Sequence, residues 1–149
     1  MNSVLMIVLL FISTLFYAQE HDTRLNWETD FEIAKTKSKK SKKPILMLFT
    51  GSDWCAPCKM LKKDFFYSDK FIEKSNHFVL LLVDFPRNKE LITPAQEAAN
   101  KVLNSKYGVR SLPTLIAVNY KGNILDKIKS YNSGRDTSYH FEFIDKLLR

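Results

Sequence analysis

The sequence predicts a single α/β domain, in which helices pack on a mixed β-sheet. Two continuous apolar runs of strand length, residues 45–49 and 78–83, are typical of strands that are buried on both faces of a sheet. Segments with helical periodicity precede, separate and follow these runs, as in layered α/β folds. The chain has 149 residues, 45% of them hydrophobic, which suffices for one sizeable core.

The amino-terminal segment, residues 1–18, carries no charged side chain and contains a nearly unbroken apolar run, residues 4–17. That run is short for a transmembrane helix, which needs about 20 apolar residues, and polar residues begin directly after Ala18. We therefore expect residues 1–18 to be a cleaved signal peptide and residues 19–149 to be the folded domain. The alternative is an uncleaved anchor, the only case in which membrane contact is expected. A cleaved signal peptide and an uncleaved anchor both place the domain in a disulfide-permissive compartment, periplasmic or secreted.

The net charge of +7 is concentrated in six lysines that crowd one segment: Lys35, Lys37, Lys39, Lys40, Lys42 and Lys43. Such a run occurs in patches that bind nucleic acid or anionic membranes. An exported protein meets little nucleic acid, and lysines near the carboxyl end of a helix interact favourably with the helix dipole. We therefore expect a solvated helix face and no nucleic-acid partner.

The first half of the domain is expected to run helix, strand, helix, helix. Asn26 or Thr29 is available to cap the first helix, and Pro44 ends it. Its apolar stripe has four members: Trp27, Phe31, Ile33 and Ala34. After the strand at residues 45–49 and a turn at residues 50–53, a helix is expected to bury Cys58, Leu61, Phe65 and Phe66. Ser68 is then expected to cap a short helix that carries Phe71 and Ile72.

The second half begins with the strand at residues 78–83, which Asp84 ends, and a polar loop at residues 85–92. Thr93 and Pro94 predict the start of a helix, with Gln96 completing a capping box and Gly108 closing the helix in the left-handed conformation. The apolar residues of this helix are Ala95, Ala98, Ala99, Val102 and Leu103. Two antiparallel strands, residues 114–118 and 124–128, and a final helix follow. That helix starts at Asp136 and carries Tyr139, Phe143, Ile144 and Leu147.

The two cysteines of the chain, Cys55 and Cys58, are separated by two residues. Cys55 is expected at the start of a helix, where unpaired N–H groups and the helix dipole favour thiolate, the attacking species. Cys58 lies about one turn further on and is expected to resolve the mixed disulfide that Cys55 forms. Pro57 restrains the turn without loss of a hydrogen bond.

At two places the chain resembles the thioredoxin family. The segment Trp54-Cys55-Ala56-Pro57-Cys58-Lys59 is similar to its active-site motif, and Ser111-Leu112-Pro113-Thr114 is similar to the cis-proline loop that faces this motif. The resemblance extends over residues 25–149. It implies a thioredoxin-like three-layer sandwich, a mixed central sheet flanked by helices, with Pro113 opposite Cys55. It also implies a substrate-binding surface formed by Trp54, Ala56, Pro57, Leu112 and Pro113.

Within the family, the stretch at residues 49–55 resembles exported bacterial thioredoxin-like proteins and the carboxyl-terminal domain of membrane thiol:disulfide interchange proteins. Two positions depart from the family pattern. Phe49 stands where the resemblance implies a buried aspartate that accepts the proton of the resolving thiol, and Ala56 stands where a glycine is expected. Asp53, Asp84 or water are the replacements for that acid, and the sequence does not rank them.

The function that follows is thiol:disulfide exchange with exported proteins, with an upstream thiol as electron donor and no cofactor beyond the cysteine pair. No histidine lies between the cysteines to stabilise the Cys55 thiolate further, which favours the reducing direction. Two alternatives stay open: a partner-binding module that turns over poorly, and a metal site that joins the cysteines to two of the three histidines, His21, His77 and His140. The absence of a second ligand pair at close spacing disfavours the metal site, so none is expected.

Overall fold

The computed structural model describes residues 24–149, so the predicted signal peptide, residues 1–18, lies outside the described part of the chain. Five strands form one sheet in the order β1-β3-β2-β4-β5. Their bounds are β1 Trp27–Glu28, β2 Ile45–Thr50, β3 Val79–Asp84, β4 Thr114–Val118 and β5 Ile124–Lys129. The α-helices are α2 Phe31–Ser41, α3 Ala56–Leu61, α4 Asp69–Ser75, α5 Pro94–Lys106 and α6 Ser138–Leu147. A π-helix, Lys62–Phe66, follows α3 directly, and a 3-10 helix, Lys89–Leu91, lies in the loop after β3. In residues 24–149 no helix has the length and apolar character that crossing a membrane requires.

The sheet is mixed, as predicted. β3 pairs in parallel with both β1 and β2, whereas β4 runs antiparallel to β2 and to β5. The five-residue turn between β4 and β5 explains the antiparallel pairing, because only a short connection is needed to reverse the chain. The carboxyl end of β2 therefore lies beside the amino end of β4, so the chain segments around Cys55 and Pro113 meet at one end of the sheet.

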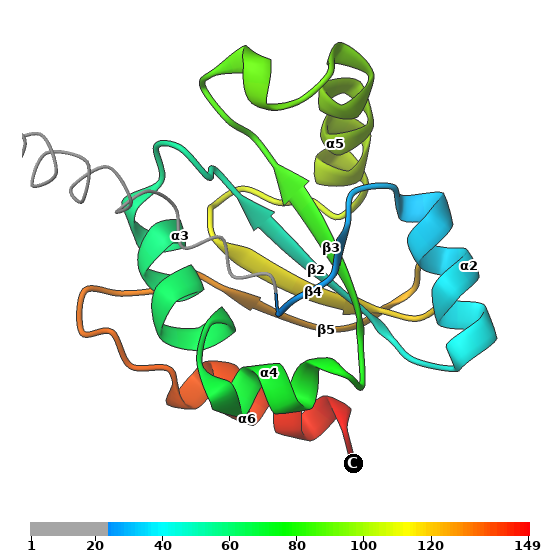
Figure 1. Cartoon of the computed structure of the whole chain (residues 1–149), viewed down its shortest axis with the longest axis vertical. Helices are drawn as coiled ribbons and strands as arrows, with labels where there is room; N and C mark the ends of the chain where they lie inside the picture. Colours follow the sequence, from blue (N-terminus) through cyan, green and yellow to red (C-terminus); the bar gives the residue numbers. More distant parts are fainter. Residues whose placement is uncertain (1–23) are drawn as a thin grey trace, which may run out of the picture.

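Helices cover both faces of the sheet, which gives three layers (Figure 1). Alternate residues of β2 point to opposite faces: Leu46 and Leu48 pack in a core layer with α3, α4 and α6, whereas Ile45, Met47 and Phe49 pack in a second layer with α2 and α5. All six residues of β2 are buried. The apolar run at residues 45–49 is therefore a central strand that is covered on both faces, as predicted.

The start of the domain differs from the sequence prediction in two respects. Trp27 does not belong to the first helix but to the short strand β1, where it lies opposite Leu80, and its ring contacts Phe66 with centroids 5.2 Å apart. The cap of α2 is neither Asn26 nor Thr29 but Asp30, whose carboxylate accepts a hydrogen bond from the Ile33 amide at 3.0 Å. A two-residue strand leaves too short a pattern to be recognised.

The lysine-rich end of α2 is solvated, as expected. Lys39, Lys40, Lys42 and Lys43 are exposed. The helix ends at Ser41, two residues before the expected limit, because Lys42 takes up the left-handed conformation with φ of 57°.

Helix α5 begins as predicted but buries a different face. The Thr93 hydroxyl accepts a bond from the Gln96 amide, and Gly108 closes the helix with φ of 59°. Gln96 does not complete a capping box, because its side-chain nitrogen donates to the Thr29 carbonyl and to Asn100. Of the expected apolar residues only Leu103 is buried, and Val102 is 66% exposed.

The terminal helix also turns a different face inward from the one predicted. Phe143 and Ile144 are buried as expected, but Tyr139 is 65% exposed. His140 and Phe141 are buried instead and pack against the aromatic ring of Phe65. The prediction was wrong because a histidine in the repeat was not counted as a core residue.

Candidate active site

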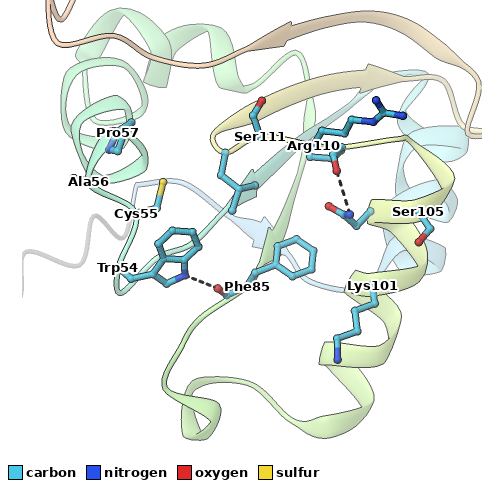
Figure 2. A pocket seen from close by; sticks show the side chains of 12 residues that line it. Trp54, Cys55, Ala56, Pro57, Phe85, Lys101, Ser105, Arg110 and Ser111 are labelled. Atoms are coloured by element: carbon cyan, nitrogen blue, oxygen red, sulfur yellow. Dashed lines mark hydrogen bonds between the residues drawn. The ribbon is translucent and has the colours of Figure 1, made fainter.

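Cys55 and Cys58 form a disulfide at the junction between β2 and α3, with their Cα atoms 5.2 Å apart. Cys55 is the amino-terminal cap of α3, and its backbone N–H donates to the Gly51 carbonyl at 2.8 Å across the connecting turn. Pro57 occupies the first turn of the helix, where a missing N–H costs no hydrogen bond. Both cysteine side chains are 4% exposed, and Cys55 faces a groove (Figure 2).

Trp54 lies over Gly51 and against the following loop. The indole nitrogen donates to the Phe85 carbonyl at 2.8 Å, and the side chain remains 40% exposed beside Cys55 (Figure 2). A Cβ atom at Gly51 would lie 2.6 Å from the indole ring, so only glycine permits this approach. The position of Trp54 therefore depends on a residue three positions earlier in the turn.

Asp53 fastens the loop after β3 to the cysteine turn. Its carboxylate accepts hydrogen bonds from the backbone amides of Arg87 at 3.0 Å and Asn88 at 2.8 Å. The Asn88 bond contributes most to a pKa of Asp53 below its ordinary value. The guanidinium of Arg87 lies 4.7 Å from the centroid of the Trp54 ring. Loop and turn thus form one surface beside the disulfide.

Asp84 holds the same turn from the end of β3. Its two carboxylate oxygens accept from the backbone amide of Ser52 at 2.9 Å and from the Ser52 hydroxyl at 2.5 Å. The backbone carbonyl of Asp84 accepts from the buried Asn100 side chain of α5 at 2.8 Å. Asp84 therefore joins three elements around the site.

The peptide bond between Leu112 and Pro113 is cis, as the resemblance implied. The Thr114 hydroxyl donates to the Ser111 carbonyl at 2.8 Å, and the Ser130 amide donates to the Pro113 carbonyl at 2.8 Å. These bonds fix the loop before β4, where the chain approaches the cysteine turn.

A groove of about 890 Å³ opens between these segments. Its walls include five of the predicted site residues: Trp54, Cys55, Ala56, Pro57 and Leu112. The other two predicted residues, Cys58 and Pro113, are buried and do not line it. The structure therefore brings the cysteine motif and the proline loop together, with Leu112 rather than Pro113 exposed to the groove.

Sequence reasoning missed most of the opposite wall of this groove. That wall is formed by Phe85, Lys101, Asn104, Ser105, Val109, Arg110 and Ser111. In Figure 2, Lys101, Ser105 and Arg110 lie across the groove from Cys55 and Pro57. Phe85 begins the loop after β3, which the sequence shows only as a polar stretch. The residues of α5 that face the groove are polar, and a polar helix face looks the same in the sequence whether it binds a substrate or only meets solvent.

Two of the three histidines of the metal alternative, His77 and His140, lie in the described part of the chain. His140 is buried, with its ring 5.5 Å from those of Phe65 and Tyr131, whereas His77 is exposed at the end of α4. Residues 24–149 contain no group of three or more His, Cys, Asp or Glu side chains placed to hold a metal ion. His21 lies outside these residues.

Comparison with known proteins shows relatives that share both sequence and fold. The family described as "Thioredoxin-like domain" matches residues 31–144. "Thioredoxin-related protein DsbJ" of Chlamydia pneumoniae is 30% identical over 93% of the chain, but the chain spans only 41% of that protein. "Disulfide bond reductase DsbH" of Chlamydia pneumoniae is 32% identical over 77% of the chain and 68% of its own length.

Solved structures agree with this result. "DsbH Oxidoreductase" superposes with a TM-score of 0.74 at 27% identity, over 89% of this chain and 92% of that one. A thioredoxin from Thermus thermophilus superposes with a TM-score of 0.62 at 15% identity, over 85% and 88% of the two chains, and shows the fold alone. With the family match over residues 31–144, these similarities show that the chain belongs to the thioredoxin-like family.

Proposed function

We propose that the chain is a thiol:disulfide oxidoreductase that reduces disulfide bonds of exported proteins through Cys55 and Cys58. The observation that carries the proposal is the disulfide at the β2–α3 junction, with Cys55 open to a groove that the cis-proline loop borders. The name of a relative of the same family, a disulfide bond reductase, supports the reducing direction.

The reaction starts from the dithiol form. The Cys55 thiolate attacks one sulfur of the substrate disulfide, that S–S bond breaks, and the other substrate sulfur leaves as a thiolate that takes up a proton. Cys58 then loses its proton and attacks the sulfur of Cys55, which forms the Cys55–Cys58 disulfide and releases the second substrate thiol. Two electrons pass to the substrate, and a dithiol donor upstream returns them to the protein.

The roles of the remaining site residues follow from the groove. Trp54, Ala56, Pro57 and Leu112 contact the substrate segment around its disulfide, and Pro113 fixes the backbone beside which that segment lies. The redox-active cysteine pair is the only redox group that this mechanism needs, and it uses no metal.

The proposed setting is an exported compartment, periplasmic or secreted. It rests on the sequence pattern of residues 1–18, which we propose to be a signal peptide, with residues 19–149 as the thioredoxin-like domain. In such a compartment proteins carry the disulfides that this domain would reduce. Contact with the membrane arises only if the amino-terminal segment is retained.

Trapping of the covalent intermediate tests the proposal. Substitution Cys58→Ser removes the resolving thiol, so exported proteins should accumulate as mixed disulfides on Cys55, visible as adducts that a reducing agent releases on gel electrophoresis. The Cys55→Ser variant is the matched control and should trap nothing. Equal adduct formation by the two variants, or none by either, contradicts the proposed roles.

A second candidate, a module that binds a partner and turns over slowly, is favoured by one observation. Phe49 is fully buried at the position where the thioredoxin resemblance implied an acid that serves the resolving thiol. Binding of a partner protein that survives Cys55→Ser, together with negligible turnover of the wild type, would support this candidate over the first.

A further inference from the structure

We propose that the groove selects substrate segments with acidic residues a short distance from the reactive cysteine. This inference rests on the proposed function and adds the chemical class of the substrate. The groove has a volume of about 890 Å³, within the range of clefts that bind ligands. Its lining includes two cationic side chains, Lys101 and Arg110, and no acidic one.

The positive charge of Arg110 is not neutralised nearby. No ion pair within residues 24–149 includes this side chain, and it is exposed at the rim of the groove across from Cys55 (Figure 2). A carboxylate of a bound segment would therefore gain an ion pair there without displacing an existing one.

Lys101 belongs to a group with a net positive charge. Lys89 and Lys101 both contact the same carboxylate oxygen of Glu97 at 2.9 Å, so two cations share one anion. These bonds, that of Lys101 first, lower the pKa of Glu97 to about 2. Lys101 lines the groove and Glu97 does not. A substrate in the groove would therefore meet the ammonium group of Lys101 and not the carboxylate of Glu97.

A third cation, Arg87, does not line the groove but contacts Trp54, which does. The guanidinium of Arg87 lies 4.7 Å from the Trp54 ring. The carboxylate of Asp53 accepts bonds from the backbone amides of Arg87 and Asn88 and does not line the groove. Two cations thus line one wall of the groove and a third contacts Trp54 of the other, and complementary charge speeds encounter and suppresses partners of like charge.

The apolar part of the groove places this charge preference along the substrate. Phe85 and Val109 line the same wall of the groove as Lys101 and Arg110, so apolar and cationic side chains alternate across from Cys55. Acidic residues a few positions from the substrate cysteine would therefore meet this wall, since an extended chain advances about 3.3 Å per residue.

The experiment measures single-turnover reduction of three short peptide disulfides by the dithiol form of the full chain. The peptides are identical except for Glu, Gln or Lys on both sides of the central cysteine, three positions away. The Glu peptide should react about three- to tenfold faster than the Lys peptide, the scale of one or two half-exposed ion pairs, with the Gln peptide between them. In about 1 M salt, where the Debye length is about 3 Å, the three rates should converge.

Two variants with the same change in net charge locate the effect. Arg110→Glu should reduce the Glu-to-Lys rate ratio to one or below. Lys40→Glu, an exposed position of α2 at the opposite end of the sheet, should keep the wild-type ratio.

Equal rates for the three peptides with the wild type, or an unchanged ratio in Arg110→Glu, overturn the inference and leave the proposed function standing. Failure to reduce even the Gln peptide overturns the proposed function and the inference with it.

Discussion

At the scale of single residues, the carboxylates of Asp53 and Asp84 beside the cysteine turn both accept hydrogen bonds from other groups of the protein. Asp53 accepts bonds from two loop amides, and both oxygens of Asp84 bond to Ser52. Phe49 is fully buried and packs against Tyr107 with ring centroids 6.5 Å apart. Both acids thus have structural roles in the turn, and either one would have to share or give up a hydrogen bond to accept the proton of Cys58.

Phe49→Asp should destabilise the protein by at least about 3 kcal/mol, because it removes a buried aromatic ring and leaves an unpaired carboxyl group in an apolar layer. Urea denaturation measures this change. Phe49→Leu is the matched control and should cost about 1 kcal/mol, since the position stays apolar. An aspartate variant as stable as the wild type would show that the layer accommodates an acid after all.

His140 predicts a pH dependence of stability. Its ring is 4% exposed, neither ring nitrogen has a hydrogen-bond partner, and burial lowers its pKa, while Asp136 opposes this in part. The ring of Tyr131 contacts that of His140, but the Tyr131 hydroxyl donates its hydrogen bond to Asp64. Because the folded state resists protonation, stability is full above about pH 6.5 and falls as the pH drops below that value.

Urea denaturation at pH 7.5 and at pH 5 tests this dependence. The loss of stability on acidification should be smaller in His140→Leu than in the wild type, whereas His77→Gln, at an exposed position, should keep the full loss. An equal loss in wild type and His140→Leu would assign the dependence to other groups.

At the scale of elements, the site is an assembly of three loops that meet at one end of the sheet. The bonds of Trp54, Asp53 and Asp84 join the turn before α3 to the end of β3 and the loop after it, and the bonds of Thr114 and Ser130 hold the segment before β4. None of these bonds lies within a helix or strand, so they determine how the groove keeps its shape.

Asp53→Ala should loosen the loop after β3. The backbone amides of Arg87 and Asn88 lose their acceptors, so their hydrogen exchange should accelerate several-fold. Asp136→Ala removes a carboxylate that accepts from the Ser138 amide at the start of α6, and it should leave exchange at Arg87 and Asn88 unchanged. Unchanged exchange in Asp53→Ala would show that other contacts hold the loop.

The sequence predicted those elements that carry a local pattern. The buried strands β2 and β3, the Thr93 cap and the cis bond before Pro113 were all confirmed. The short strand β1 and the Asp30 cap were missed, because two residues make no period and several polar residues compete for one cap position. The wall with Lys101 and Arg110 was missed because it forms only when α5 packs beside the cysteine turn.

At the scale of the whole molecule, the two ends of the sheet differ in chemistry. The end with the disulfide carries the groove, whereas the lysine-rich end of α2 leads into the start of β2 at the other end (Figure 1). Two core layers hold the sheet between them, so the position of the cysteine pair depends on the packed core as well as on its own motif.

Reduction of insulin disulfides with a small dithiol as electron donor tests the central claim most directly. The wild type should accelerate the precipitation of the reduced insulin chains over the dithiol alone, because Cys58 lies next to Cys55 and resolves the mixed disulfide within one chain. Cys55→Ser should return the rate to that of the dithiol. A wild type no faster than the dithiol, or a Cys55→Ser variant as fast as the wild type, would contradict the account.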